Sequence, residues 1–327
     1  EIELSLVGSE MCIRDRFNIQ NFFNIGKIIS YRGIKEGIEN TNYLISTRRQ
    51  KFILTIFEKR VKKEDLPFFM KLMDKLSNLK IKCPSPLKSK KGNYLFNLKS
   101  KKACLVSFLK GKDKKKLKKE DLYVIGKNIG KMHKASRKIR LYRKNTFSPL
   151  KLKNLLDSIN KNKINKLSKN LVSEMKNTFM EIKQGWPKTL PKNIIHGDLF
   201  IDNIFFHKGK FLGFIDFYFS SNDFEAYELA TCINALCFNK RKKKFSYDKG
   251  KTLQLIKGYE TIRKLQKKEK DCLNILCKGS ALRYLATRSY DYINTPKSAI
   301  IKKKDPREYI QKLAFHKKIN SFSSYIK

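Results

Sequence analysis

NIIHGDLFIDNIFFHKGKFLGFIDFYFSSND, at residues 193–223, is the stretch of this chain that predicts its fold. It holds four Asp and three Asn among apolar and aromatic residues that are otherwise typical of buried strands. Charged groups inside such sequence cost free energy unless they are paired or bind a metal ion. Gly209 separates two apolar runs, which predicts a β-hairpin. The polar residues therefore indicate a functional loop that is followed by a hairpin.

The polar residues of this stretch follow a definite spacing. H-G-D occupies residues 196–198, four residues separate it from Asn203, and Asp216 comes thirteen positions later and is followed by Phe. Protein-kinase-like enzymes use H-x-D-x-x-x-x-N as a catalytic loop and a later D-F for a metal-binding Asp. We therefore expect Asp198 to orient the acceptor hydroxyl or take its proton, and Asn203 and Asp216 to bind Mg²⁺. His196 is expected among the catalytic residues as the hydrogen-bonding organiser of the loop.

The chain changes character after its first third. Residues 17–109 contain β-branched and aromatic runs broken by Gly and Asn, together with one amphipathic helix. A Lys-rich connector follows at 110–120, and the sequence after it is mainly helical apart from the stretch quoted above. This pattern predicts an α+β, bilobal, protein-kinase-like fold, with a β-rich nucleotide-binding lobe at 17–109 and a mainly helical catalytic and substrate lobe at 110–327. Residues 1–16 contain no Lys and are expected to be a non-native or disordered leader.

The chain is strongly basic, with 74 Lys and Arg against 29 Asp and Glu and a formal net charge of +45. Such a charge is typical of nucleic-acid-binding proteins, but a Lys-rich composition also follows from an A/T-rich genome. The basic residues are spread over the whole chain and are not interleaved with aromatic residues as in binders of RNA or of single strands. We therefore expect no specific nucleic-acid partner. The charge disfavours a polycationic substrate and is compatible with ATP.

Seven cysteines are present, an odd number, and none of them has C-x-x-C spacing. With only four His in the chain, a zinc site is not expected. Reduced, buried thiols and a cytoplasmic location are the interpretation that fits this pattern. The apolar runs are short and interrupted by polar residues, which predicts no transmembrane helix and no membrane partner.

Several segments of the chain together resemble one family. In chain order, YRGIKEGIENTNYLI, FILTIFEKRVKKEDLPFFMKLMDKL, HGDLFIDNIFF, GFIDFYFSSND, GSALRYLATRSYDY and KKDPREYIQKLAFH resemble the phosphotransferase-type homoserine kinases of the aminoglycoside phosphotransferase/choline kinase-like superfamily. The resemblance runs from Phe17 to the C-terminus. It implies ATP-dependent phosphorylation of the homoserine hydroxyl to O-phospho-homoserine, a step of threonine biosynthesis. Position by position, the resemblance implies that Asp198 is the base and that Asn203 and Asp216 bind Mg²⁺.

The resemblance also implies where the nucleotide binds. The segment Val106–Leu109 would be the hinge that meets adenine through backbone groups, with Ser107 and Leu109 as binding residues. The turn at Glu36–Asn42 would cover the phosphates, with Asn42 among the binding residues.

The sequence departs from protein kinases in the residues that hold the phosphates. GIKEGIENTN replaces the Gly-rich loop, and Thr55 occupies the position of the strand Lys. We expect Lys59, four residues on and on the same strand face, to reach the phosphates instead, with Glu64 orienting it. The alternative is that both are ordinary surface charges.

A homoserine substrate is a zwitterion and needs partners of both signs. A carboxylate is bound well by a bidentate Arg, and Arg283 and Arg288 are the candidates. Asp223 is the candidate partner of the ammonium group, and Tyr218 is expected to line the substrate site. Salt bridges between helices are the alternative role for the charged residues of this set.

Two other functions fit parts of the sequence. A kinase of the same superfamily would act on another hydroxyl acceptor, such as choline, an aminosugar or a related amino alcohol. The net charge argues against aminoglycosides, and the single Trp lies outside the motif region, which argues against an aromatic cage for choline. A basic nucleic-acid-binding protein with an inactive kinase fold would not need Asp198, Asn203 and Asp216 together. The sequence leaves the oligomeric state open.

Overall fold

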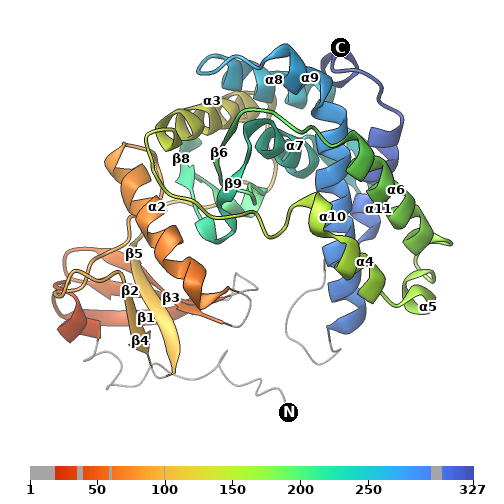
Figure 1. Ribbon diagram of the computed structural model, residues 1–327. Helices are drawn as coiled ribbons and strands as arrows, with labels where there is room; N and C mark the ends of the chain where they lie inside the picture. Colours follow the sequence, from red (N-terminus) through yellow and green to blue (C-terminus); the bar gives the residue numbers. More distant parts are fainter. Residues whose placement is uncertain (1–18, 35–39, 59–60, 99, 296–303) are drawn as a thin grey trace. The chain divides into compact units, whose positions relative to one another are not determined.

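The computed structural model describes residues 19–34, 40–58, 61–98, 100–295 and 304–327 (Figure 1). The chain forms two compact units. Unit 1 comprises the residues up to Lys112 together with Phe205–Tyr218, and unit 2 comprises Asp113–Ile204 and Phe219–Lys327.

Unit 1 contains a five-stranded antiparallel sheet in the order β1-β2-β3-β5-β4 (Figure 1). Its strands are β1 (Ile28–Ile34), β2 (Asn40–Thr47), β3 (Lys51–Phe57), β4 (Leu95–Leu98) and β5 (Lys101–Ser107). Because side chains alternate across a strand, one face of the sheet carries a continuous apolar core. Its members include Phe23, Ile45, Phe52, Leu54, Phe96 and Leu105.

The predicted amphipathic helix is confirmed as α2 (Leu66–Asn78), preceded by the 3₁₀ turn η1 (Lys63–Asp65). Pro67 lies in its first turn, where a missing N–H costs nothing. Its buried side chains are apolar and include Phe69 and Met73. The Phe69 ring lies edge-on to that of Tyr218, with centroids 5.8 Å apart, so the helix packs against the segment that follows the hairpin.

The predicted hairpin is confirmed as β7 (Ile204–His207) and β8 (Lys210–Phe214). Lys208 and Gly209 form its turn, both with positive φ, of 47° and 78°, as a two-residue type I′ hairpin requires. The predicted division of the chain placed residues 205–218 in the C-terminal lobe, whereas these residues group with unit 1.

Backbone hydrogen bonds explain this grouping. Phe206 exchanges N–H and C=O bonds of 2.8 and 3.0 Å with Lys112, and the Phe214 N–H donates to the Lys82 carbonyl at 3.0 Å. Glycines permit the close approach, because a Cβ on Gly111 would lie 2.8 Å from the Phe206 oxygen and one on Gly213 would lie 2.6 Å from the Lys82 oxygen.

Unit 2 is mainly helical. Its helices are α3 (Lys119–Ser136), α4 (Lys153–Ser158), α5 (Lys161–Ile164), α6 (Leu171–Gly185), α7 (Glu225–Leu236), α8 (Lys249–Glu260), α9 (Lys267–Asp271), α10 (Leu273–Asn294), α11 (Arg307–Lys317) and α12 (Ser323–Ile326). The 3₁₀ turns are η2 (Pro149–Lys151), η3 (Ile201–Asn203) and η4 (Phe217–Phe219), which begins in unit 1. Two antiparallel strand pairs complete it, β6 (Lys192–Ile195) with β9 (Ser221–Phe224) and β10 (Phe238–Arg241) with β11 (Lys244–Tyr247).

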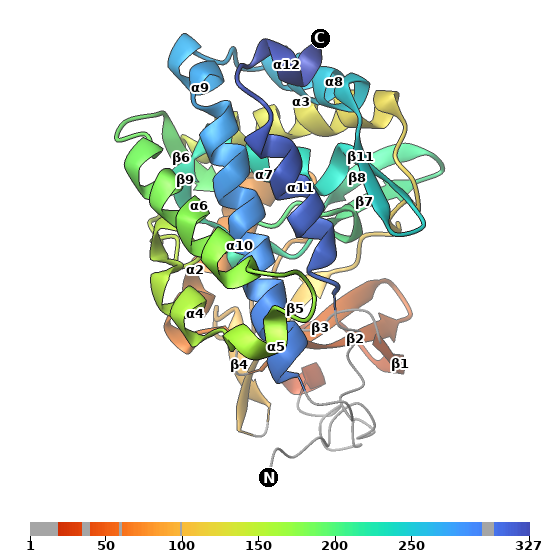
Figure 2. The same ribbon diagram turned by 90° about the vertical axis from the view of Figure 1, so that its right-hand side faces the viewer.

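The long helix α10 forms the centre of unit 2. Helices α4, α6, α7 and α11 pack around it, as Figure 2 shows for the green and blue helices. The apolar core between α4, α6, α10 and α11 contains Leu156, Met175, Phe179, Leu282, Leu285 and Leu313. Among the described residues, no helix combines the length and apolar character that a membrane crossing requires.

Helices α3 and α8 approach each other so closely that glycine is required at the contact. A Cβ on Gly126 would overlap the carbonyl oxygen of Leu255, and a Cβ on Gly258 would overlap that of Tyr123. Because backbone atoms on both sides would have to move, this crossing fixes the position of α3, which also packs against β6.

Replacing Gly258 with Ala is expected to lower the melting temperature by several degrees, because overpacking against rigid backbone costs about 1–3 kcal/mol. The matched control is Gly185→Ala in the same unit, where the added Cβ would meet only the Ile275 side chain, at 3.4 Å. Thermal unfolding followed by circular dichroism checks this. Equal melting temperatures for the two variants would contradict the proposed close contact.

Candidate active site

The H-G-D loop begins where β6 ends. Strand β6 pairs with β9, with Ile195 opposite Ser221, so the loop lies beside the start of β9. Gly197 has a φ of +80°, and a Cβ there would lie 3.0 Å from the Phe219 carbonyl oxygen. Both the conformation and the space therefore favour glycine at this position of the loop.

Asp198 is held by hydrogen bonds to both of its carboxylate oxygens. The Tyr284 hydroxyl donates to Oδ1 at 3.0 Å, and the Asn203 amide Nδ2 lies 3.3 Å from Oδ2. The same Nδ2 donates to the Asp198 carbonyl at 2.8 Å. Burial raises the pKa of Asp198, and the charges of Arg283 and His196 only partly oppose this. The structure thus brings together two of the predicted residues, Asp198 and Asn203, as neighbours in one loop.

His196 is fully buried beneath this loop. Its Nδ1 accepts the backbone N–H of Asp198 at 3.3 Å, which is the kind of contact expected of a loop organiser. Its carbonyl accepts a hydrogen bond of 3.4 Å from Ser220. The ring therefore lies next to the predicted base, and its catalytic assignment stays a prediction.

Glu228 on α7 is a residue that the sequence interpretation missed. Its carboxylate is fully buried and accepts the backbone N–H groups of His196 and of Gly197, the second at 3.1 Å. His133 Nε2 lies 3.9 Å away. Burial alone would raise the pKa of Glu228, but hydrogen bonding and charge from His133 and His196 bring it below the usual value. The available signal was an acidic residue inside the apolar helix that follows the motif.

Helix α10 approaches the same loop from another direction. Arg283 is 4% exposed and donates through Nη1 to the Gly197 carbonyl at 3.0 Å. Its guanidinium lies over the rings of Tyr284 and Phe147, at 4.8 and 5.3 Å from their centroids. Tyr284, the next residue of α10, was also missed by the sequence interpretation.

Arg288, the second predicted carboxylate ligand, forms an ion pair of 2.7 Å with Glu308 on α11. Its guanidinium also lies 4.5 Å from the Tyr309 ring centroid. This contact is the salt bridge between helices that the sequence left as the alternative. A role for Arg288 in substrate binding stays a prediction.

Asp223 is a half-buried carboxylate on β9. The Asn145 amide donates to its Oδ2 at 2.6 Å, and the Phe224 N–H donates to its Oδ1 at 2.8 Å. Burial raises the pKa of Asp223. In the part of the chain that the structure describes, no Lys or Arg forms an ion pair with it.

Unit 1 carries Asp216 and Tyr218. Asp216 follows β8 and has a φ of 63°, a left-handed conformation that costs energy outside glycine and often occurs at functional sites. The Tyr218 ring packs edge-on against Phe57, with centroids 5.1 Å apart, and its hydroxyl lies 3.8 Å from the Cys104 sulfur. Burial raises the pKa of Tyr218 well above its ordinary value, so its hydroxyl stays protonated.

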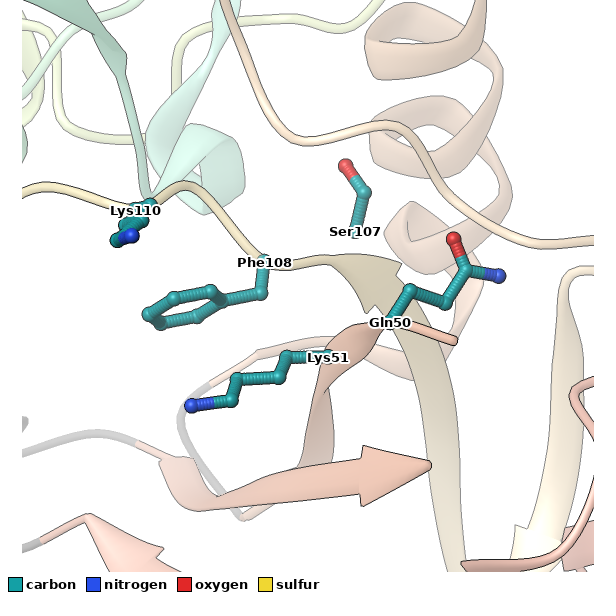
Figure 3. A pocket seen from close by; sticks show the side chains of 5 residues that line it. All are labelled: Gln50, Lys51, Ser107, Phe108 and Lys110. Carbon is teal, nitrogen blue, oxygen red and sulfur yellow. The ribbon is translucent and has the colours of Figure 1, made fainter. Parts of the chain in front are cut away.

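A cavity of about 340 Å³ lies in unit 1 beside the predicted hinge (Figure 3). The start of β3 and the segment at the end of β5 supply its lining residues, which are Gln50, Lys51, Ser107, Phe108 and Lys110. Leu109 lies between Phe108 and Lys110 in the chain, and no hydrogen bond from its backbone N–H occurs within the described residues. Of the predicted nucleotide ligands, Ser107 therefore lines a cavity and Leu109 adjoins it.

The remaining predicted nucleotide residues lie elsewhere. Asn42 accepts a hydrogen bond of 2.8 Å from the Thr55 hydroxyl on the neighbouring strand. Glu64 is exposed in η1. Lys59 and most of the turn at Glu36–Asn42 lie outside the described residues, as do residues 1–16. Within the described ranges, no three His, Cys, Asp or Glu side chains form a group that could hold a metal ion.

Comparison with known proteins identifies the family. The model of the phosphotransferase enzyme family matches residues 30–257, more than half of the chain. The chain belongs to the phosphotransferase enzyme family. The family recognised from the sequence is thereby confirmed, and the chain is an enzyme that uses ATP.

Two curated relatives of this phosphotransferase carry the same name. The homoserine kinase of Agrobacterium fabrum (strain C58) is 40% identical over 310 residues, which cover 94% of this chain and 95% of the relative. The homoserine kinase of Chelativorans sp. (strain BNC1) is 39% identical over 303 residues, covering 93% of each chain.

A solved amicoumacin kinase, in complex with AMP-PNP, Ca²⁺ and Ami, has a similar fold. The TM-score is 0.71 at 13% identity, and the match covers 92% of this phosphotransferase and 90% of the solved chain. The predicted fold class is confirmed: the phosphotransferase has the α+β, protein-kinase-like fold, with a sheet in its N-terminal part and helices in its C-terminal part.

We expect Glu228→Gln to destabilise this phosphotransferase by about 2 kcal/mol or more, because one of two buried N–H groups loses a charged acceptor. The folded-state pKa of Glu228 lies below the usual 4.5. Its contribution is therefore fully present above that pH and is lost as the pH falls through the folded-state pKa. The unfolding free energies of the wild type and of Glu228→Gln, measured from neutral to acidic pH, should converge at the acidic end.

Glu181→Gln is the control for this substitution, because its carboxylate is about half exposed and pairs with Lys278 at the surface. This variant should be as stable as the wild type at every pH. A constant stability difference between Glu228→Gln and wild type down to acidic pH would show that the carboxylate charge is not what holds the loop.

Proposed function

We propose that this phosphotransferase transfers the γ-phosphoryl group of ATP to the side-chain hydroxyl of homoserine, giving O-phospho-homoserine and ADP for threonine biosynthesis. The observation that carries the proposal is the loop in which Asp198 is fixed at both carboxylate oxygens. It occurs in a chain that is 38–40% identical, over more than nine-tenths of its length, to proteins named homoserine kinase.

In this proposal Asp198 is the catalytic base. The homoserine O–H bond breaks as the new O–P bond forms and the bond from the γ-phosphorus to ADP breaks, and Asp198 accepts the proton. Burial raises the pKa of Asp198, which makes its carboxylate a better proton acceptor than an exposed Asp. His196 stabilises the loop, because its Nδ1 accepts a hydrogen bond from the Asp198 backbone N–H.

We further propose Asn203 and Asp216 as protein ligands of Mg²⁺, on the spacing of the motif. Amide and carboxylate oxygens are ligands that Mg²⁺ prefers. The Asn203 amide donates through Nδ2 to Asp198, so its Oδ1 remains as an acceptor. When bound, Mg²⁺ supplies positive charge that neutralises the phosphate oxygens.

The adenine is proposed to bind at the cavity beside the hinge. Ser107 lines this cavity, and the Leu109 N–H is a donor of the kind that hinge residues offer to a purine. The side chains of Lys51 and Lys110 give the cavity a positive charge, which suits an anionic nucleotide. Lys59, Glu64 and Asn42 remain proposed for the phosphates on the sequence alone.

For the substrate, Asp223 is the proposed partner of the ammonium group. Its two hydrogen-bond donors are neutral amides, and the charges of Lys192 and Arg283 act on it without forming an ion pair within the described residues. Tyr218, Arg283 and Arg288 remain proposed substrate residues on the sequence alone. Free thiols, most of them buried, agree with the proposed cytoplasmic location.

Asp198→Asn is expected to lower kcat by about 10²- to 10⁴-fold, because the amide cannot accept the proton. The measurement is coupled ADP release with homoserine, serine, threonine, choline and an aminoglycoside as acceptors. Homoserine should give the highest kcat/KM with the wild type. Turnover of choline or of an aminosugar with none of homoserine would replace the proposed substrate by the second candidate, and no turnover of any acceptor would reject the kinase function.

Asp223→Asn is expected to raise the KM for homoserine at least about tenfold, because a half-buried charge pair with the ammonium group is lost. The KM for ATP should stay unchanged. Asp202→Asn is the matched control, since its side chain is 60% exposed and lies 3.9 Å from Lys304. Steady-state kinetics with each substrate varied in turn checks this, and equal homoserine KM values for the two variants would remove Asp223 from the site.

A further inference from the structure

We infer that Tyr284 is a positioning residue for the reaction, whose hydroxyl fixes the orientation of the Asp198 carboxylate. The inference rests on the proposed role of Asp198 as the catalytic base. Neither the motif nor the spacing of the loop assigns any role to Tyr284, which lies 86 residues further along the chain.

The hydroxyl of Tyr284 is within hydrogen-bond distance of two oxygens of the loop. Asp198 Oδ1 lies at 3.0 Å and the Gly197 carbonyl oxygen at 3.3 Å. A hydroxyl carries a single proton, and a carboxylate is the stronger acceptor. The shorter contact therefore receives the proton. Burial raises the pKa of Tyr284 well above its ordinary value, which keeps this proton on the donor.

The two carboxylate oxygens of Asp198 are held by donors from different elements. Tyr284 on α10 binds Oδ1, and Asn203 at the end of η3 binds Oδ2. Rotation of the carboxylate would break both contacts at once. Each oxygen retains a further lone pair, so the orientation is fixed while an acceptor site for the substrate hydroxyl remains.

The position of the donor is itself fixed by the packing of its ring. Phe200 lies edge-on to the Tyr284 ring with centroids 4.9 Å apart, and the Tyr309 ring lies 5.3 Å away. The Arg283 guanidinium covers the ring at 4.8 Å and also donates to the Gly197 carbonyl. Consecutive residues of one rigid helix thus hold consecutive residues of the loop, Arg283 at a carbonyl and Tyr284 at a carboxylate.

A positioning role predicts a specific kinetic result for Tyr284→Phe, which removes the hydroxyl and keeps the ring. The rate of phosphoryl transfer in a single turnover should fall about 10- to 100-fold, the loss expected when a hydrogen bond to a charged group is removed. The single-turnover rate is used because product release can limit kcat. The KM values for ATP and homoserine should stay within about twofold, since the ring and the loop remain packed.

Tyr309→Phe is the matched control. Tyr309 belongs to the same ring cluster, and within the described part of the chain its buried hydroxyl has no hydrogen-bond partner. This variant should have wild-type kinetics. Phe200→Leu keeps the Tyr284 hydroxyl but loosens its ring, and it should lower the single-turnover rate by a smaller factor without changing either KM. Melting temperatures of all three variants show whether each is folded.

Three outcomes would overturn the inference. The first is a Tyr284→Phe variant with a wild-type single-turnover rate. The second is a raised homoserine KM at an unchanged rate, which would make Tyr284 a substrate ligand. The third is an unfolded Tyr284→Phe variant accompanied by a folded Phe200→Leu variant of wild-type rate, which would make the contact structural. All three require an active wild type, whereas failure of the proposed function would leave the wild type itself without homoserine turnover.

Discussion

The hydrogen bonds from the backbone of His196 and Gly197 to the Glu228 carboxylate are the constraint on which the geometry of the loop depends. A buried carboxylate is costly unless its oxygens are occupied by donors. Here two successive peptide N–H groups donate to them, and His133 Nε2 lies 3.9 Å away without a hydrogen bond. The loop cannot slide along α7 without leaving a buried charge uncompensated, so the peptide that precedes Asp198 has one stable position.

Much of this structure could be predicted from local patterns in the sequence. β-branched and aromatic runs predicted the strands, and apolar residues at helical spacing predicted α2. Gly209 between two apolar runs predicted the hairpin, because turn chemistry is a property of neighbouring residues. The spacing of the motif placed Asp198 and Asn203 in one loop, and five residues of a tight loop bring their side chains into contact. These predictions needed no knowledge of how distant segments meet.

The residues that hold the loop from outside could not be predicted in this way. Glu228 and Tyr284 contact the loop across 31 and 86 residues of sequence, and only the packing of α7 and α10 brings them there. Arg288 shows the same limit, because its ion pair with Glu308 depends on the packing of α11 against α10, which the sequence does not show. The grouping of residues 205–218 with unit 1 could not be predicted for a similar reason. The hairpin joins unit 1 through backbone hydrogen bonds, which the pattern of side chains does not reveal.

The basic composition of the chain bears on its carboxylates. Cations outnumber acids by 74 to 29, so a half-buried acid has many potential partners. Glu225 and Glu308 follow this expectation, with Arg263 and Lys312 as partners. Asp223 differs, because its hydrogen-bond donors are amides and the charges of Lys192 and Arg283 act on it only from a distance, so that a cation in direct contact is lacking among the described residues. An ammonium group on the substrate would supply that cation, and a basic protein surface would concentrate the anionic nucleotide at the same time. The excess of Lys and the exception at Asp223 thus fit a reaction between ATP and a small amine-bearing alcohol.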